Sequence, residues 1–332
     1  MLINKKAKTI VFLSILLLLL VVIGCSIGRY PLSFTEVVKT LIGQGTYRSN
    51  MVIFSLRLPK ILLAIMVGIG MGISGTIMQR ILHNDLASPG TLGVADGSSL
   101  FVTIYIALIA KNFNNPLLLP ILAFMGGVLS AIIIFVLGTK NKKPISSIKL
   151  IMTGVAMSAC YSAISIFIMY LLDETQLEFL YRWQAGDLWG SEWNYLIILG
   201  TWLSVFIVLA IYSAKILNVI GLGSEVAIGL GVKMKSTFIY LALIAIAMSS
   251  SVVAFGGNFF FLGLIGPHIA KKLIGIDALT LIPVSGIVSA IIIVAAIILV
   301  ENVPIFINIP TGIIINILSV PYFLYLLIER DG

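Results

Sequence analysis

The chain has 332 residues, of which 60% are hydrophobic and only 10% are charged. Soluble domains average about 25% charged residues, so this composition excludes a water-soluble globular protein and predicts an all-α polytopic membrane protein. The net charge of +8 does not require a nucleic-acid partner, because the positions of the basic residues fit a rule of membrane orientation.

Apolar runs long enough to cross a bilayer recur along the whole sequence. A helix needs about 20 residues to cross a hydrocarbon core of ~30 Å. We expect about ten such helices, at residues 9–28, 60–80, 92–110, 117–138, 148–171, 194–214, 237–256, 259–274, 281–300 and 311–328. The run 259–274 is short and contains Pro267, so a re-entrant segment is the alternative there.

The first apolar run has a second interpretation. Lys5, Lys6 and Lys8 precede it as the charged region of a secretory signal would, and "VIGC" at residues 22–25 resembles a lipoprotein cleavage box. Nine further spans follow, so we expect a membrane helix.

The basic residues predict the orientation. With the N-terminus in the cytoplasm, 14 of the 21 Lys and Arg residues fall in inner segments and 7 in outer ones, as the excess of positive charge in cytoplasmic loops requires. We therefore expect a multi-pass protein of the cell membrane with both termini inside. Lys140–Ser147 is expected to be an inner loop, and the acidic stretch Asp173–Glu192 an outer loop.

The connecting segments contain no enzyme motif. None is long enough for a nucleotide-binding domain, and the sequence has neither a G-x-x-x-x-G-K-[ST] phosphate loop nor an H-E-x-x-H zinc motif. A membrane enzyme could use the acidic residues between Asp173 and Glu192, but we expect a solvated acidic loop there instead. We expect one transmembrane permease domain over residues 1–332, no catalytic or metal residues, and no cofactor.

Charges inside the spans are scarce. Proton and ion pathways of secondary transporters carry buried ionisable residues, whereas the predicted spans hold Asp96 and few others. Gly68, Gly72 and Gly75 lie on one helical face, which predicts close helix packing.

An irregular segment separates the second and third spans. It reads "NDLASPGTLG" from Asn84 to Gly93, and Pro89 and Gly90 favour a turn. Irregular backbone at such a depth requires protein or a water-filled cavity around it. The segment is therefore either an ordinary loop or the lining at the inner end of a pathway.

Four blocks in collinear order resemble one family. They are Arg57–Leu100, Gly221–Val232 with "GLGSEVAIGLGV", Phe261–Gly275 with "GLIGPHIAKKLIG", and Ile309–Leu327 with "IPTGIIINILSVPYF". The chain is similar to the FecCD family, the ten-helix permeases of type II ABC importers for iron-siderophores, haem and vitamin B12.

The resemblance implies function and partners. The chain would be the permease of an ATP-driven importer of iron-siderophores, with haem or cobalamin as alternative cargo and an ATPase-independent secondary transporter as the alternative class. It would act in a bacterial inner or plasma membrane with a second permease subunit, identical or different. Its other partners would be a cytoplasmic ABC ATPase dimer and an extracellular or periplasmic binding protein.

The resemblance also implies a cytoplasmic gate. Asn84 and Leu86 would lie near the dimer axis, with Ser146 and Ser147 of the loop between helices four and five as the other contributors. The family usually has Pro where this chain has Asp85. This difference is expected to loosen the turn, and the sequence does not decide whether the resting gate is open or closed.

Two further sites are implied. Gly221–Val232 would form two short coupling helices for the ATPase, with a sharp bend between them at Gly231. The coupling residues are Gly223, Ser224, Glu225, Ala227, Leu230 and Gly231. Arg57 and Lys60 would dock the binding protein, with Arg57 the stronger contact, or would only anchor their helix at the interface. A structural role is expected for His268, whose function the sequence leaves open.

Overall fold

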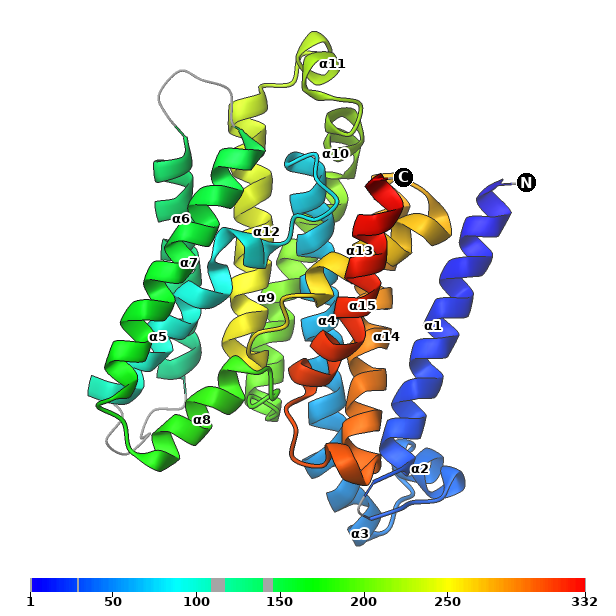
Figure 1. Cartoon of the computed structure of the whole chain (residues 1–332). Helices are drawn as coiled ribbons and strands as arrows, with labels where there is room; N and C mark the ends of the chain where they lie inside the picture. The colour runs from blue at the N-terminus through cyan, green and yellow to red at the C-terminus, as the bar shows by residue number, and fades with distance from the viewer. Residues whose placement is uncertain (1, 29, 109–116, 140–145, 332) are drawn as a thin grey trace.

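The computed structural model describes residues 2–28, 30–108, 117–139 and 146–331, and in this part of the chain it contains helices and no strand (Figure 1). The all-α prediction is confirmed. In chain order the elements are α1 (Leu2–Ser26), α2 (Phe34–Leu41), α3 (Tyr47–Asn50), η1 (Met51–Arg57), α4 (Leu58–Ile81), η2 (Pro89–Leu92), α5 (Val94–Leu108), α6 (Leu118–Gly138), α7 (Ser147–Met169), α8 (Glu174–Gln184), α9 (Trp193–Tyr212), α10 (Ala214–Ile220), α11 (Ser224–Gly229), α12 (Met234–Gly256), α13 (Leu262–Ile274), α14 (Ala278–Asn302), η3 (Pro304–Phe306) and α15 (Thr311–Asp331).

Every predicted span overlaps one of these helices along most of its length. Within the described residues, seven helices are long and apolar enough to cross a membrane. The other three, α5, α13 and α15, are shorter or only partly described. The starts of α1 and α12 and the end of α15 lie at the same end of the bundle as α11, while α2, α3 and α8 lie at the opposite end (Figure 1).

The first helix belongs to the bundle. Leu13 of α1 is buried in an apolar cluster with Val284 and Val288 of α14, and the Lys6 ammonium lies 3.6 Å from the Asp277 carboxylate that precedes α14. The structure thus supports the interpretation of this run as a membrane helix.

The short helix α13 completes a crossing. A re-entrant segment would return the chain to the end where α12 finishes, away from α11. Instead, the Asn218 side-chain amide of α10 donates to the Asp277 carboxylate at 2.8 Å and its oxygen accepts the backbone N–H of Ala278 at 2.7 Å. The start of α14 therefore lies at the α10 end, and the re-entrant alternative is wrong.

Helix α4 is longer than the sequence predicted. Residues Tyr47–Ile81 form one continuous helical run, because the π-helical turn η1 absorbs the disturbance from Pro59, which has no N–H to donate. The N–H of Leu58 accordingly bonds to the carbonyl of Ile53. The segment between the first two predicted spans, which was expected to be a loop, thus contains α2, α3 and η1.

The glycine face of α4 packs as predicted. A Cβ atom at Gly68 would lie 2.5 Å from the Ala290 Cα of α14, and one at Gly72 or Gly75 would overlap the carbonyl oxygen of Ser285 or Gly263. Backbone-to-backbone contact of this kind needs residues without a side chain. These glycines place α4 directly against α14 and α13.

The predicted outer loop at 173–192 was wrong in part, because it contains α8. Asp173 accepts the Gln176 N–H at 2.8 Å, while the Gln176 side chain accepts the Asp173 N–H at 3.2 Å. This reciprocal capping box starts a helix, and Leu180 and Trp183 bury its inner face. Of the other predicted loop, residues 140–145 lie outside the described part of the chain.

Candidate functional site

The break between α4 and α5 is a compact, hydrogen-bonded turn. The Asn84 side-chain oxygen accepts the backbone N–H of Leu86 at 3.0 Å, and the Asn84 carbonyl accepts the N–H of Ala87 at 3.0 Å. The Thr91 hydroxyl then donates to the Ser88 carbonyl at 2.6 Å. Side chains in this way replace the helical bonds that the break removes.

Asp85, which is expected to loosen this turn, also connects it to a neighbouring helix. Its carboxylate forms an ion pair with the Lys271 ammonium of α13, with Nζ–O distances of 2.8 and 3.0 Å. The turn is therefore fastened to a neighbouring helix at the position where the family usually has Pro. Both side chains are 35–43% exposed, so water screens the pair.

A third contact joins the same turn to α10. The imidazole Nε2 of His83 lies 2.9 Å from the carbonyl oxygen of Ile220, and its backbone has a φ of 49°. The Arg80 guanidinium of α4 bonds to the carbonyl of Ile276. A polar cavity of about 230 Å³ between α4, α10 and α13 includes His83, Asp85 and Lys271 in its lining.

The start of α7 contacts the turn as well. The Ser147 hydroxyl donates to the Leu82 carbonyl at 2.7 Å, and Ser146 is the residue before α7, where its carbonyl accepts the N–H of Leu150 at 3.1 Å. The structure brings the two predicted gate segments together. Whether they act as a gate stays a prediction.

The coupling segment differs in one respect from the expectation. Residues 221–232 contain only α11, and the second short helix, α10, precedes them. The bend between the two short helices lies at Gly223 (φ 110°), whereas Gly231 (φ 85°) lies between α11 and α12. Both positions are left-handed, which favours glycine, but the bend was assigned to the wrong one.

The α11 end of the molecule exposes an apolar surface. It consists of Leu222, Val226, Ile228 and Leu230, which are 48–63% exposed. Ser224 and Glu225 are also exposed, and Ala227 is buried. An apolar patch on a segment that extends beyond the membrane helices indicates a protein partner.

The two predicted docking residues lie at the opposite end, in different settings. The Arg57 side chain is 8% exposed, and its guanidinium donates to the backbone carbonyls of Cys25 at 2.6 Å and Tyr30 at 2.7 Å. Lys60 is more accessible and pairs with Glu301 at 2.9 Å. As placed, Arg57 anchors the end of α1 to α4, so its docking role needs a side-chain rearrangement and stays a prediction.

Both residues border a cavity of about 390 Å³ that Arg182 and Asp187 also line. The Arg182 Nε donates to the Asp187 carboxylate at 2.8 Å, and this bond raises the pKa of the guanidinium. The end opposite α11 thus carries three basic side chains around one opening, two of them in ion pairs.

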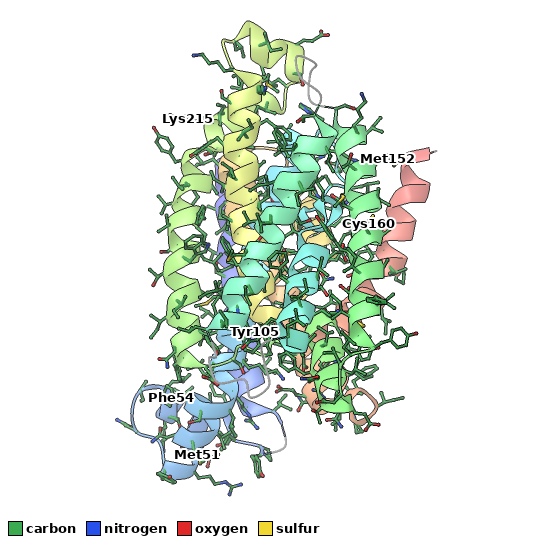
Figure 2. The ribbon with its side chains drawn as sticks, turned by 90° about the vertical axis from the view of Figure 1, so that its left-hand side faces the viewer. Met51, Phe54, Tyr105, Met152, Cys160 and Lys215 are labelled. Atoms are coloured by element: carbon green, nitrogen blue, oxygen red, sulfur yellow. The ribbon has the colours of Figure 1, made fainter. Side chains whose placement is uncertain are left out.

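The rest of the chain covers little of helix α7: only 17% of its most apolar stretch is buried, the same share as for α1. Met152 is 62% exposed and Cys160 is also exposed, and both lie on the outer surface of the bundle (Figure 2). The N-terminal halves of α5 and α7 meet where the Ser158 hydroxyl donates to the Asp96 carboxylate at 2.6 Å.

The comparisons with known proteins agree with this geometry. A family model described as the FecCD transport family matches residues 16–329. The chain belongs to this family. It is 33% identical over 336 residues to the iron(3+)-hydroxamate import system permease protein FhuG of Bacillus subtilis, with 99% of each chain covered.

Two further similarities point the same way. The hemin transport system permease protein HmuU of Yersinia pestis is 30% identical, with 96% of this chain and 95% of that one covered. A solved structure described as an inward-facing metal-chelate type ABC transporter superposes with a TM-score of 0.83 at 26% identity, with 98% of this chain and 99% of that one covered. The FecCD resemblance of the four sequence blocks is confirmed.

Sequence reasoning missed the partners of the turn. In the sequence, neither Lys271 nor His83 stands out as a partner of the turn. Asp85 and Lys271 are 186 residues apart, so no local pattern pairs them. The available signal was an acidic residue in the turn and a basic residue on a segment expected at the same membrane face.

The Asp85–Lys271 pair can be tested by a double-mutant cycle. We expect Asp85→Asn and Lys271→Gln to destabilise the protein non-additively, with a coupling energy of about 0.2–1 kcal/mol, because the pair is partly exposed. Chemical unfolding in detergent at low and high salt measures it, and salt should reduce the coupling. The charge-swapped double variant should recover part of the lost stability. Strictly additive effects at low salt, with no recovery in the swap, would contradict the pairing.

Proposed function

We propose that this FecCD-family chain is the permease subunit of an ATP-driven importer of ferric siderophores. Family membership, the ten-span architecture and the break between α4 and α5 support a pathway-forming subunit. The FhuG relative is named for iron(3+)-hydroxamate import, and this supports a siderophore as the cargo. Haem is the second candidate, because HmuU is named for hemin transport, and cobalamin is the third.

The exposed apolar surface at the α11 end is the observation that supports binding of a separate ATPase. In an aqueous compartment this surface is unfavourable unless a partner covers it, and the chain has no phosphate loop of its own. We propose that a cytoplasmic ABC ATPase dimer docks there. Movement of α11 would pass through α10, which packs against α11, to the turn by way of the His83–Ile220 contact.

A second permease subunit is proposed at α7. Only 17% of the most apolar stretch of this helix is buried within the chain, against 78% for α4. A pathway at the interface would place Asn84, Leu86, Ser146 and Ser147 at its inner end, where apolar and amide groups close it against water. The chain is expected to need no cofactor of its own. Both termini, with α11, are proposed to lie in the cytoplasm.

The energy source separates this proposal from a secondary transporter. In a strain lacking the gene and complemented with it, we expect uptake of ⁵⁵Fe-labelled hydroxamate siderophore to fall when arsenate depletes ATP and to persist when a protonophore collapses the proton gradient. Labelled haem and cobalamin in the same strain identify the cargo. Uptake that survives ATP depletion and stops with the protonophore would establish a secondary transporter.

Variants at Gly231 test coupling in the same assay. A side chain there meets no atom within 4 Å, so Val changes only the backbone preference, whereas Asn tolerates the left-handed conformation. Uptake should fall sharply for Gly231→Val and largely persist for Gly231→Asn, at equal membrane abundance. Gly229→Ala, on the same exposed segment without a left-handed backbone, is the control. Equal uptake by Gly231→Val and Gly231→Asn would reduce Gly231 to a linker residue.

Docking of a binding protein at the outer end is proposed for Lys60 and Arg57. Rim charges act mainly on association rate, so Lys60→Glu should raise the siderophore concentration needed for half-maximal uptake, and added salt should do the same to the wild type. The Lys60→Glu/Glu301→Lys swap restores the internal ion pair but displaces the positive charge. Full recovery in the swap would show that Lys60 serves only Glu301. Arg57→Gln should mainly reduce stability, because its two carbonyl partners lose their donors.

A further inference from the structure

A cavity lined by polar and apolar side chains lies between α5, α7 and α8. It has a volume of about 280 Å³, too small for a whole iron chelate but sufficient for one arm of it. Its polar lining residues are Asp96, Ser99, Ser162, Ser165, Tyr181 and Gln184.

Two of the helices that line this cavity, α5 and α7, also contact the proposed gate. Helix α5 begins directly after η2, the end of the turn that contains Asn84, and α7 begins at Ser147, which bonds to the same turn. The cavity therefore lies on the two helices that contact the proposed gate, but about four helical turns beyond Ser147, because its α7 residues begin at Ser162. Its third wall, α8, comes from the opposite end of the bundle and donates from the Gln184 amide to the Ser99 hydroxyl at 2.7 Å.

The side of α7 that faces this cavity carries the hydroxyls of Ser162 and Ser165 beside the apolar Ile166 and Met169. Ser158, Ser162 and Ser165 are spaced as i, i+4 and i+7, one face of a helix. Lipid-facing helix surfaces are apolar, and hydroxyls gather where they meet protein or water. This face is thus suited to a hydrated pathway.

Asp96 gives the cavity its charge. Its carboxylate accepts the Ser158 hydroxyl at 2.6 Å, and in the described part of the chain no Lys or Arg forms an ion pair with it. An acidic side chain at membrane depth is expensive unless it faces a water-filled cavity or meets a partner. Passing cargo with positive charge or hydrogen-bond donors would provide such a partner.

We infer that this cavity is a cargo subsite that selects by charge. It receives a polar arm of a neutral or cationic chelate, such as a ferric hydroxamate, and Asp96 repels anionic chelates such as ferric citrate or ferric tris-catecholates. The inference rests on the proposed import function and adds a discriminating residue to it. Hydroxyl and amide groups of the lining would bond to the carbonyl and amide groups of a hydroxamate, whereas a flat apolar macrocycle would leave them unpaired.

Uptake of two hydroxamate complexes that differ in charge tests the subsite. The probes are ⁵⁵Fe-ferrioxamine B, which is cationic, and ⁵⁵Fe-ferrichrome, which is neutral. Each is supplied singly at low concentration, and the ratio of initial rates is compared between variants, so that differences in membrane abundance cancel. Asp96→Asn keeps the shape and removes the charge. It should lower the cationic-to-neutral ratio by about tenfold, equivalent to about 1.4 kcal/mol, since one unit charge near another in a partly hydrated site interacts at about this level or above.

Two further variants keep the test decisive if Asp96→Asn accumulates poorly. Asp96→Glu keeps the charge and should keep the ratio, while Ser162→Lys reverses the local charge and should lower the ratio further. Glu178→Gln, an exposed carboxylate of α8 outside the cavity lining, is the control and should leave the ratio unchanged.

Failure of the subsite differs from failure of the import function. If wild type takes up neither complex in an ATP-dependent way, the proposed function fails. If wild type takes up both, and neither Asp96→Asn nor Ser162→Lys changes the ratio, the charge-selective subsite is overturned while the import function stands.

Discussion

Close backbone packing along α4 is the constraint on which the rest of the structure depends. In a bilayer, lipid tails are as apolar as side chains, so van der Waals contact and hydrogen bonds hold helices together. Gly68, Gly72 and Gly75 let the backbone of α4 touch α14 and α13. The same helix carries Arg57 and Lys60 at one end and leads into the turn at Asn84 at the other. Its fixed position therefore sets the proposed docking end and the proposed gate relative to one another.

The turn after α4 shows how irregular backbone is accommodated beside a membrane. Near the end of the helix, the Asn84 side chain bonds to backbone within the turn and Ser147 from α7 bonds to the Leu82 carbonyl. Contacts with α10 and α13 then link the turn to the α11 end. These linking contacts are polar and partly exposed, in contrast to the tight glycine seam. A rigid α4 core beside a more weakly fastened turn is the distribution of stability that a moving gate requires.

The sequence predicted the spans well because bilayer thickness imposes a length and an apolar composition on every crossing. It also located the glycine face of α4, since the i, i+4, i+7 spacing is local. It failed for the short, amphipathic helix α8. The acidic residues there suggested a solvated loop, although Asp173 forms a capping box that starts a helix. It could not place the bend at Gly223 rather than Gly231, because both are glycines of one motif and only the backbone distinguishes them. Pairs such as Asp85 with Lys271 depend on tertiary structure, so only the structure reveals them.

The orientation of the bundle decides whether the turn is an inner gate and α11 an ATPase-binding segment. It can be measured by labelling single cysteines with a membrane-impermeant thiol reagent, in a protein whose Cys25 and Cys160 are replaced by Ala. Glu178→Cys on α8 and Lys235→Cys at the start of α12 are exposed positions at opposite ends of the molecule. The account predicts that Glu178→Cys is labelled in intact cells or spheroplasts and that Lys235→Cys is labelled only after the membrane is permeabilised. Labelling of Lys235→Cys but not Glu178→Cys in intact cells would contradict it.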